Sequence, residues 1–145
     1  MTVLQNLSLE MGAILRSWWP EDPKRIEPGT KFRPVVFLAE KEIAGVRHFV
    51  VAYGTSKTEQ HKEARNGGDL LVLVLDEGQV VLNADTRFDF NQIRVIPATE
   101  QFFCSSHDGL PVKTSAIPHR YYQSVLQAMQ CADVPRQFVR LGITV

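Results

Sequence analysis

The sequence has few cysteines, no long apolar run and no excess charge of either sign. Its two cysteines, Cys104 and Cys131, have a spacing that fits no metal site. We therefore expect reduced, partly buried thiols in a cytoplasmic protein rather than a disulfide. The longest apolar stretches, such as Leu70–Leu75, are far too short to span a bilayer, so no membrane association is expected.

Other common signatures are also missing. Sixteen basic and sixteen acidic residues give a formal net charge of zero, which argues against strong overall attraction to nucleic acid but permits a local basic patch. No G-x-S-x-G elbow or Walker-type glycine pattern is present. The first twelve residues lack a basic segment and a long apolar one, so we expect no secretory signal. No metal-ligand spacing links the cysteines to the histidines His48, His61, His107 and His119.

Short apolar runs separated by turn residues dominate the first hundred residues and predict strands. The clearest three are Gly12–Trp19, Pro34–Ala39 and Val46–Tyr53, and Gly54 is expected to stop the third. Gln92–Ile96 alternates and predicts a further strand. Two more runs flank a turn and predict a hairpin, namely Asp69–Leu75 and Gln79–Leu82 around Asp76–Gly78.

The pattern becomes helical near Ile117. Apolar residues spaced i, i+3, i+4 and i+7 share one helix face, and these are Tyr122, Val125, Leu126 and Met129. Pro118 suits a first helical turn, and Ser115 is a candidate cap. We expect a helix at about residues 117–131, and the pattern of the last nine residues favours no assignment.

Many short strands followed by one helix indicate a mainly β fold. We expect a compact β-barrel or strongly bent sheet with a C-terminal α-helix packed on it. The length suits a single domain over residues 1–145, with a β core at about 11–97 and a tail at 132–145. The segment Thr55–Gly68 is long, polar and mostly charged, which is typical of a mobile surface loop.

Arg33 is the first candidate for chemistry, because it precedes Pro34 at the start of an apolar strand. The proline fixes the neighbouring backbone, and the strand anchors that backbone in the core. A guanidinium held in this way can bind a phosphate through two parallel hydrogen bonds. The alternative is an arginine whose guanidinium is simply solvated.

Two further stretches carry suitable side chains. Tyr53–Lys57 places two hydroxyls and an ammonium directly after Gly54, where they can bind an anion or form a turn that bonds its own backbone. Arg87 and Asp89 share one face of a strand if that segment is extended, with phenylalanines on the other face. Such a pair is either a surface ion pair or a proton-transfer couple.

Taken in order, these segments resemble the MazF/PemK/Kid family of bacterial toxin endoribonucleases. They are similar to the family's M-G-x-I/L strand, its R-P-V/A-V-V-L strand, its P-x-T-S/T segment and its R/A-x-D-Q…R/K-x-I element. The resemblance covers about residues 11–97, with a terminal helix expected afterwards. The matching segments are Met11–Ile14, Phe32–Leu38, Tyr53–Lys57, Arg87–Phe90 and Ile93–Ile96.

The resemblance implies a small SH3-like barrel that forms a homodimer and cleaves single-stranded RNA without a metal or other cofactor. The ribose 2′-hydroxyl would attack the adjacent phosphorus, giving a cyclic phosphate and a free 5′-hydroxyl. This reaction needs a base, a cation for the phosphorane charge and an acid for the leaving oxygen. Such a toxin inhibits growth and is neutralised by an antitoxin that occupies the RNA groove.

Residue by residue, the resemblance assigns the catalytic roles. Arg33 matches the arginine that would stabilise the phosphorane, and Thr55 matches the hydroxyl that contacts the scissile phosphate. Arg87 and Asp89 match an acid/base pair, with Asp85 as a competing match for the aspartate. Glu27 resembles an acidic loop residue in another branch of the family and is the fifth catalytic candidate. The expected RNA-binding residues are Lys31, Ser56 and Lys57.

The chain also departs from the family pattern. Tyr53–Gly54 replaces the proline before the T-S segment, and Phe90 replaces the glutamine after the aspartate. These changes keep an alternative open, which is a catalytically inactive SH3-like barrel that binds a protein or nucleic-acid partner. Trp18, Trp19 and Tyr53 would then supply aromatic contacts, since such residues are enriched at interfaces.

Overall fold

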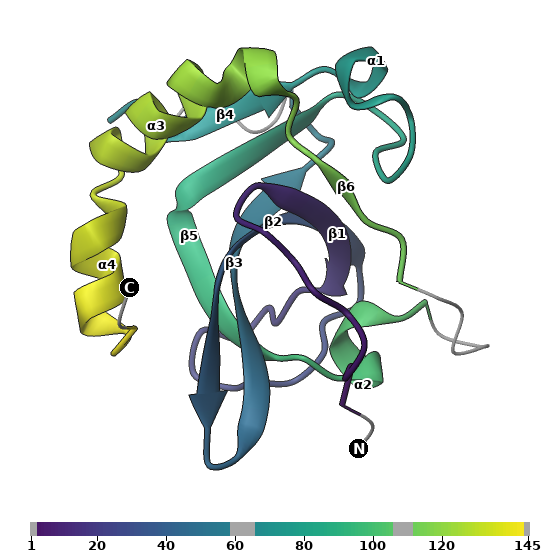
Figure 1. The fold of residues 1–145 in the computed structure, drawn as a ribbon, viewed down its shortest axis with the longest axis vertical. Helices are drawn as coiled ribbons and strands as arrows, with labels where there is room; N and C mark the ends of the chain where they lie inside the picture. The colour runs from purple at the N-terminus through teal and green to yellow at the C-terminus, as the bar shows by residue number, and fades with distance from the viewer. Residues whose placement is uncertain (1–2, 59–65, 106–111, 144–145) are drawn as a thin grey trace.

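A curled antiparallel sheet forms most of the molecule (Figure 1). The structure is a computed structural model that describes residues 3–58, 66–105 and 112–143. Within these ranges the six strands have the spatial order β4-β5-β3-β2-β1-β6, and the sheet bends like part of a barrel. The predicted mainly β class is confirmed. The strands are β1 Ala13–Trp18, β2 Phe32–Ile43, β3 Val46–Thr55, β4 Asp69–Val72, β5 Thr86–Pro97 and β6 Ser115–Ala116.

Short helices pack around this sheet. In Figure 1, α3 lies along β4 and α4 lies beside β5, whereas α2 lies near the end of β1. The predicted C-terminal helix is confirmed as α3, and a further helix, α4, begins before the last nine residues, whose pattern favoured no assignment, and continues into them. The helices are α1 Val74–Glu77, α2 Glu100–Phe103, the 3₁₀ turn η1 His119–Tyr121, α3 Tyr122–Cys131 and α4 Val134–Arg140.

Alternation along the strands divides the core between the two faces of the sheet. On β2, Val35 and Phe37 pack with Phe103 of α2, whereas Val36 and Leu38 pack with Val125 of α3. We call these the α2 face and the α3 face. Away from the irregularities at Phe37–Ala39 and Ala52–Tyr53, the period of two means that the apolar neighbours of a polar residue show which face it lies on.

The predicted hairpin around Asp76–Gly78 is wrong. β4 ends at Val72, the next residues form α1, and β4 pairs with β5 instead of with Gln79–Leu82. Glu77 explains the difference, because its buried carboxylate accepts hydrogen bonds from the N–H groups of Val80 and Val81 at 2.9 and 2.8 Å. These bonds satisfy backbone donors that a hairpin would have paired with a strand.

The face of α3 and its cap also differ from prediction. Val125 is buried, but Tyr122 and Leu126 are 55% and 45% exposed, and Tyr121 packs against the core instead. The proposed cap Ser115 lies in β6, where its hydroxyl donates to Glu77. The preceding 3₁₀ turn winds the chain more tightly than an α-helix, which changes the residue that faces the sheet.

The structure describes both cysteines and two of the four histidines. Both cysteines are free; Cys104 is buried, whereas Cys131 is exposed, so the partial burial expected of both thiols is wrong for Cys131. The ring Nδ1 of His48 lies 2.8 Å from the carbonyl oxygen of Val46, which suits a structural residue. His61 and His107 lie outside the described residues, and so does much of the predicted loop Thr55–Gly68.

Candidate functional site

Strand pairing brings most of the predicted catalytic residues to the α2 face. Thr55 lies opposite Arg87, and Tyr53 lies opposite both Val35 and Asp89. Residues opposite each other in an antiparallel pair point to the same side of the sheet. Since Val35 packs on the α2 face, Thr55, Arg87 and Asp89 share that face with it.

Arg33 joins the same row. It is two residues before Val35, so its side chain lies on the α2 face, and continuing the β2–β3 register brings it opposite Thr55. Neighbouring strands are about 4.8 Å apart, so the backbones of Arg33, Thr55 and Arg87 fall within roughly 10 Å. The guanidinium carbon of Arg33 lies 5.2 Å from the centre of the Tyr53 ring, a cation–π contact that holds the charge beside β3.

Three cations gather at this end of the sheet, and we call Lys31, Arg33 and Lys57 the basic cluster. The charge of Lys57, followed by that of Arg33, lowers the pKa of Lys31. The pKa of Glu21 is lowered as well. The largest cause is the hydrogen bond that Glu21 accepts from the hydroxyl of Thr30, and the charges of Arg33 and Lys31 add to it. Concentrated positive charge of this kind favours binding of an anion.

Thr55 holds the backbone of the turn after β3. Its side chain is buried, at 3% exposure, and its Oγ1 accepts the backbone N–H of Lys57 at 3.1 Å. This bond closes a turn in which a side chain binds its own backbone, which was one of the two alternatives for residues 53–57. Ser56 and Lys57 are exposed beside it. Contact between Thr55 and a phosphate stays a prediction.

Arg87 is held by Asp69, an aspartate outside the segments that resemble the family. Its Nη1 donates to Oδ2 of Asp69 at 3.1 Å, and the two side chains are 14% and 6% exposed. The Nε of Arg87 is buried and has no hydrogen-bond acceptor among the described residues. The β4–β5 register places Asp69 opposite Asp89, so two carboxylates lie beside Arg87.

Asp89 is oriented by its own neighbours in β5. Its Oδ1 accepts the backbone N–H of Asn91 at 2.9 Å and the side-chain amide of Asn91 at 3.0 Å. Its Oδ2 accepts the amide of Gln92 at 3.0 Å. The competing match, Asp85, lies before β5 and accepts the N–H of Val74 at 2.8 Å. Asp89, and not Asp85, therefore shares the face of Arg33.

Glu27 lies apart from this row in the segment between β1 and β2. It is exposed and forms a 3.8 Å ion pair with Arg25. The same segment is held to the sheet by Arg94 of β5, whose guanidinium donates to three carbonyl oxygens at 3.3–3.4 Å. Those carbonyls belong to Pro20, Asp22 and Arg25. Burial lowers the pKa of Arg94, and the charge of Asp22 partly offsets this effect.

The aromatic residues fall into two groups rather than one surface. Trp19 is buried and meets Tyr53 edge-on, with ring centres 5.2 Å apart. Trp18 packs instead on Phe32, at 4.9 Å. Trp18 and Trp19 follow each other at the end of a strand, so their rings lie in different surroundings, and a joint contact surface with Tyr53 is not formed.

Sequence reasoning missed Asp69 and Arg94. Both lie in predicted strands, but their importance depends on partners 18 to 74 residues away in the chain. A pattern of local residues contains no signal for such distant partners. Arg94 at least lies in a segment that resembled the family, which could have drawn attention to it.

Comparison with known proteins adds no assignment. No protein-family model matches the chain, and no curated protein matches it. Among the described residues, no helix has both the length and the apolar character needed to cross a membrane. The same residues hold no group of three or more histidine, cysteine, aspartate or glutamate side chains arranged to bind a metal ion.

Proposed function

We propose that this protein is a metal-independent endoribonuclease that cleaves single-stranded RNA. One observation carries the proposal: Arg33, Thr55, Arg87 and Asp89 lie on one face of three adjacent strands. The basic cluster lies at the end of the same row and would attract the RNA backbone, because phosphate contacts dominate the affinity of such complexes. The site thus offers a cation, a carboxylate and exposed hydroxyl and ammonium groups together.

The proposed chemistry assigns one task to each group. Arg33 binds the scissile phosphate and stabilises the charge that develops on its oxygens. Asp89 accepts the proton of the ribose 2′-hydroxyl as the 2′-oxygen bonds to phosphorus. The bond from phosphorus to the 5′-oxygen breaks, and Arg87 donates a proton to that leaving oxygen. Products are a 2′,3′-cyclic phosphate and a 5′-hydroxyl.

The other residues position the RNA or the catalytic groups. Lys31, Ser56 and Lys57 are exposed and would bind neighbouring phosphates or sugars. Thr55 holds the turn that carries Lys57. We further propose that the sheet corresponds to the SH3-like barrel of the MazF/PemK/Kid family, and that the chain acts in the cytoplasm as a homodimeric toxin neutralised by an antitoxin.

Cleavage of RNA by the purified protein tests the proposal. We expect single-stranded RNA to be cut in the presence of a metal chelator, leaving a cyclic phosphate. Arg33→Ala should slow cleavage by about a hundredfold or more, since one transition-state donor of this kind contributes roughly 3 kcal/mol. Arg25→Ala is the matched control, because Arg25 is an exposed arginine that precedes the same strand.

Two results would contradict the ribonuclease proposal. One is the absence of cleavage across varied single-stranded RNAs by well-folded protein. The other is equal cleavage by the wild type and by Arg33→Ala, which would show that the activity comes from another site or from a contaminant. Unfolding curves for both arginine variants show whether a loss of rate reflects a loss of fold.

A specific observation also favours a non-catalytic function. Thr55 is buried and accepts the N–H of Lys57, Arg87 is paired with Asp69, and Asp89 accepts hydrogen bonds from Asn91 and Gln92. Three of the four row residues therefore already have structural partners. A barrel that binds RNA through its basic cluster without cutting it fits these contacts. Salt-dependent RNA binding that Arg33→Ala weakens, with no cleavage by the wild type, would support this second function.

A further inference from the structure

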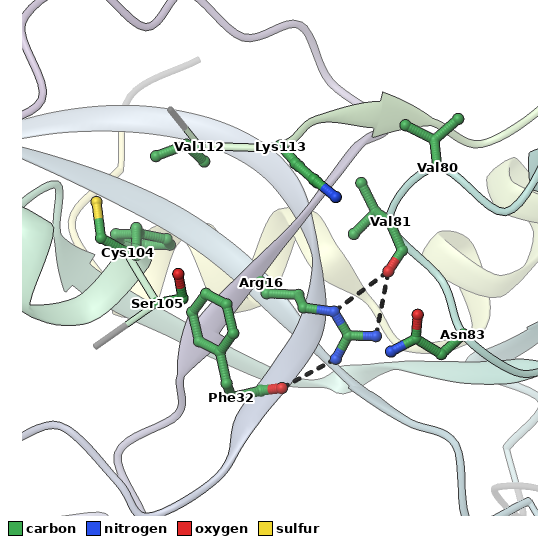
Figure 2. A pocket seen from close by; sticks show the side chains of 10 residues that line it. Arg16, Phe32, Val80, Val81, Asn83, Cys104, Ser105, Val112 and Lys113 are labelled. Atoms are coloured by element: carbon green, nitrogen blue, oxygen red, sulfur yellow. Dashed lines mark hydrogen bonds between the residues drawn. The ribbon is translucent and has the colours of Figure 1, made fainter. Parts of the chain in front are cut away.

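A pocket of about 320 Å³ lies beside β1, the start of β2 and the residues that follow α2 (Figure 2). Phe32 and Arg16 line it, and each is followed in its strand by a residue of the α2 face, Arg33 and Ser17. Successive residues of a strand point to opposite sides. The side chains of Arg16 and Phe32 therefore point away from the Arg33 row, although Phe103 and Val112 of the α2-face core also line the pocket. The lining contains none of the four residues Arg33, Thr55, Arg87 and Asp89, and nothing in the proposed function uses it.

Arg16 provides a fixed charge on one wall. Its Nη1 donates to the carbonyl oxygen of Phe32 at 2.9 Å, while Nε and Nη2 donate to that of Val81 at 3.2 and 3.1 Å. A guanidinium has five N–H donors, and these bonds to described residues use three. Burial lowers the pKa of Arg16, and the charge of Glu77 partly offsets this effect. The remaining donors can bind an acceptor in the pocket.

Polar and aromatic groups complete the walls. Figure 2 shows the exposed side chain of Lys113 extending into the hollow toward the Arg16 guanidinium, with the amide of Asn83 beside it. The ring of Phe32 forms another wall and is supported from behind by Trp18. The indole N–H of Trp18 donates to the carbonyl oxygen of Cys104 at 2.8 Å, which fixes this aromatic pair.

We propose that this pocket binds a nucleotide, with the base against Phe32 and the phosphate between Lys113 and Arg16. Every base has a planar face that stacks on an aromatic ring, and two cations suit a phosphate. Asn83 and the exposed Ser105 supply donors and acceptors for the base edge or the sugar. A bare phosphate would leave the aromatic wall unused, and an uncharged apolar ligand would leave the cations unpaired.

Titration of the isotope-labelled protein with adenosine 5′-monophosphate, followed by NMR, tests the pocket. We expect shifts of the amide signals of Arg16, Val81 and Lys113. Lys113→Gln and Phe32→Leu should each weaken binding by about fivefold or more, equivalent to roughly 1 kcal/mol. Lys24→Gln, which changes an exposed lysine in another segment, should leave the affinity unchanged.

Three results would overturn the nucleotide proposal. They are the absence of shifts at about 10 mM nucleotide, equal binding of inorganic phosphate alone, and unchanged affinity in both pocket variants. Phe32→Leu keeps an apolar side chain beside Arg33, and Lys113→Gln changes an exposed residue. If Phe32→Leu failed to fold, Lys113→Gln together with the comparison of nucleotide, adenosine and phosphate would still decide the question.

Competition with a short single-stranded RNA identifies the source of the nucleotide. Displacement of adenosine monophosphate by the RNA would show that the pocket binds one nucleotide of a longer strand. Binding that RNA does not displace would indicate a free nucleotide. Both results support a nucleotide-binding pocket. Nucleotide binding without ribonuclease activity would support the pocket and contradict only the proposed function. Cleavage without nucleotide binding would overturn the pocket and leave the proposed function unaffected.

Discussion

Lys31 lies in the field of two other cations, and this makes its protonation a measure of the basic cluster. Lys57 and Arg33 lower the pKa of Lys31 below its ordinary value of 10.5. Between the lowered pKa and 10.5, the unfolded chain keeps a proton on Lys31 that the folded protein has lost. The stability of the folded protein should therefore rise as pH increases through this interval. A bound phosphate reverses the effect, since it favours the ammonium form.

We therefore predict that binding of an RNA-like strand weakens at alkaline pH below 10.5. Affinity should be highest below the lowered pKa of Lys31 and should fall as pH rises through it. Lys57→Gln removes the largest cause of the shift, so the fall in affinity should move toward 10.5. Fluorescence anisotropy with a 2′-O-methyl oligoadenylate measures this, because that strand resists alkaline hydrolysis.

Lys24→Gln provides the control for the change of one positive charge. Its affinity profile should have the same midpoint as that of the wild type, with a slightly lower affinity throughout. An identical midpoint for Lys57→Gln and the wild type would show that Lys57 does not act on Lys31. The basic cluster would then have no electrostatic coupling between Lys57 and Lys31, and the proposal that it binds RNA would lose that support.

Gly54 shows how one position determines the fit between elements. The sequence predicted that it stops the third strand, but β3 continues to Thr55. Its importance lies in packing: a Cβ at this position would lie 2.5 Å from the carbonyl oxygen of Pro34 and 2.7 Å from the ring of Phe88. Glycine therefore allows β2, β3 and the core to approach closely beneath the row of Arg33, Thr55 and Arg87.

Gly54→Ala should lower the free energy of unfolding by about 2–3 kcal/mol, because the added methyl group forces apart well-packed neighbours. It should also slow RNA cleavage, since it separates the strands that carry Arg33 and Arg87. Urea unfolding and cleavage rates measure the two effects. Gly45→Ala is the comparison; its Cβ meets open space, so the left-handed backbone at φ 79° should cost only about 1 kcal/mol.

Equal losses of stability in the two glycine variants would contradict this account. They would show that the cost at Gly54 comes from the backbone and not from contact with Pro34 and Phe88. Phe88→Leu, which replaces the ring by a smaller side chain, should then fail to improve the Gly54→Ala protein. If packing is the cause, the double variant should lose less stability than the two single losses added together.

The elements were predictable where local pattern determines them. Alternation correctly placed Phe88 on the face opposite Arg87 and Asp89, where it is buried, and apolar runs identified β1, β2 and β3. The run Leu70–Leu75 was misread after Val72, because a short continuous apolar run does not distinguish a strand from a helical turn. For the candidate site, alternation along the strand predicted that Arg87 and Asp89 share one face of the sheet. The partner Asp69 required the β4–β5 register, which depends on contacts between distant segments.

At the scale of the whole molecule, Glu77 connects segments that are far apart in the chain. Its buried carboxylate accepts the N–H groups of Val80, Val81 and Leu82, and also the hydroxyl of Ser115 in β6. Its charge also acts on Arg16 of β1, which in turn binds the carbonyl oxygen of Val81. One side chain thus joins the α1 turn to both strands at this edge of the sheet, and it shapes a wall of the proposed nucleotide pocket.

Glu77→Gln should lower the free energy of unfolding by about 2–3 kcal/mol. A neutral amide loses the charge-assisted bonds, and its NH₂ group faces backbone donors where the second carboxylate oxygen accepted them. Urea unfolding measures the loss, with Glu42→Gln as the control because Glu42 is an exposed glutamate in β2. Nucleotide binding should weaken in Glu77→Gln as well, since Val81 no longer holds Arg16 in place. Matching stabilities for the two variants would show that the buried carboxylate contributes no more than a solvated one, and the proposed connection between β1, β6 and the α1 turn would be wrong.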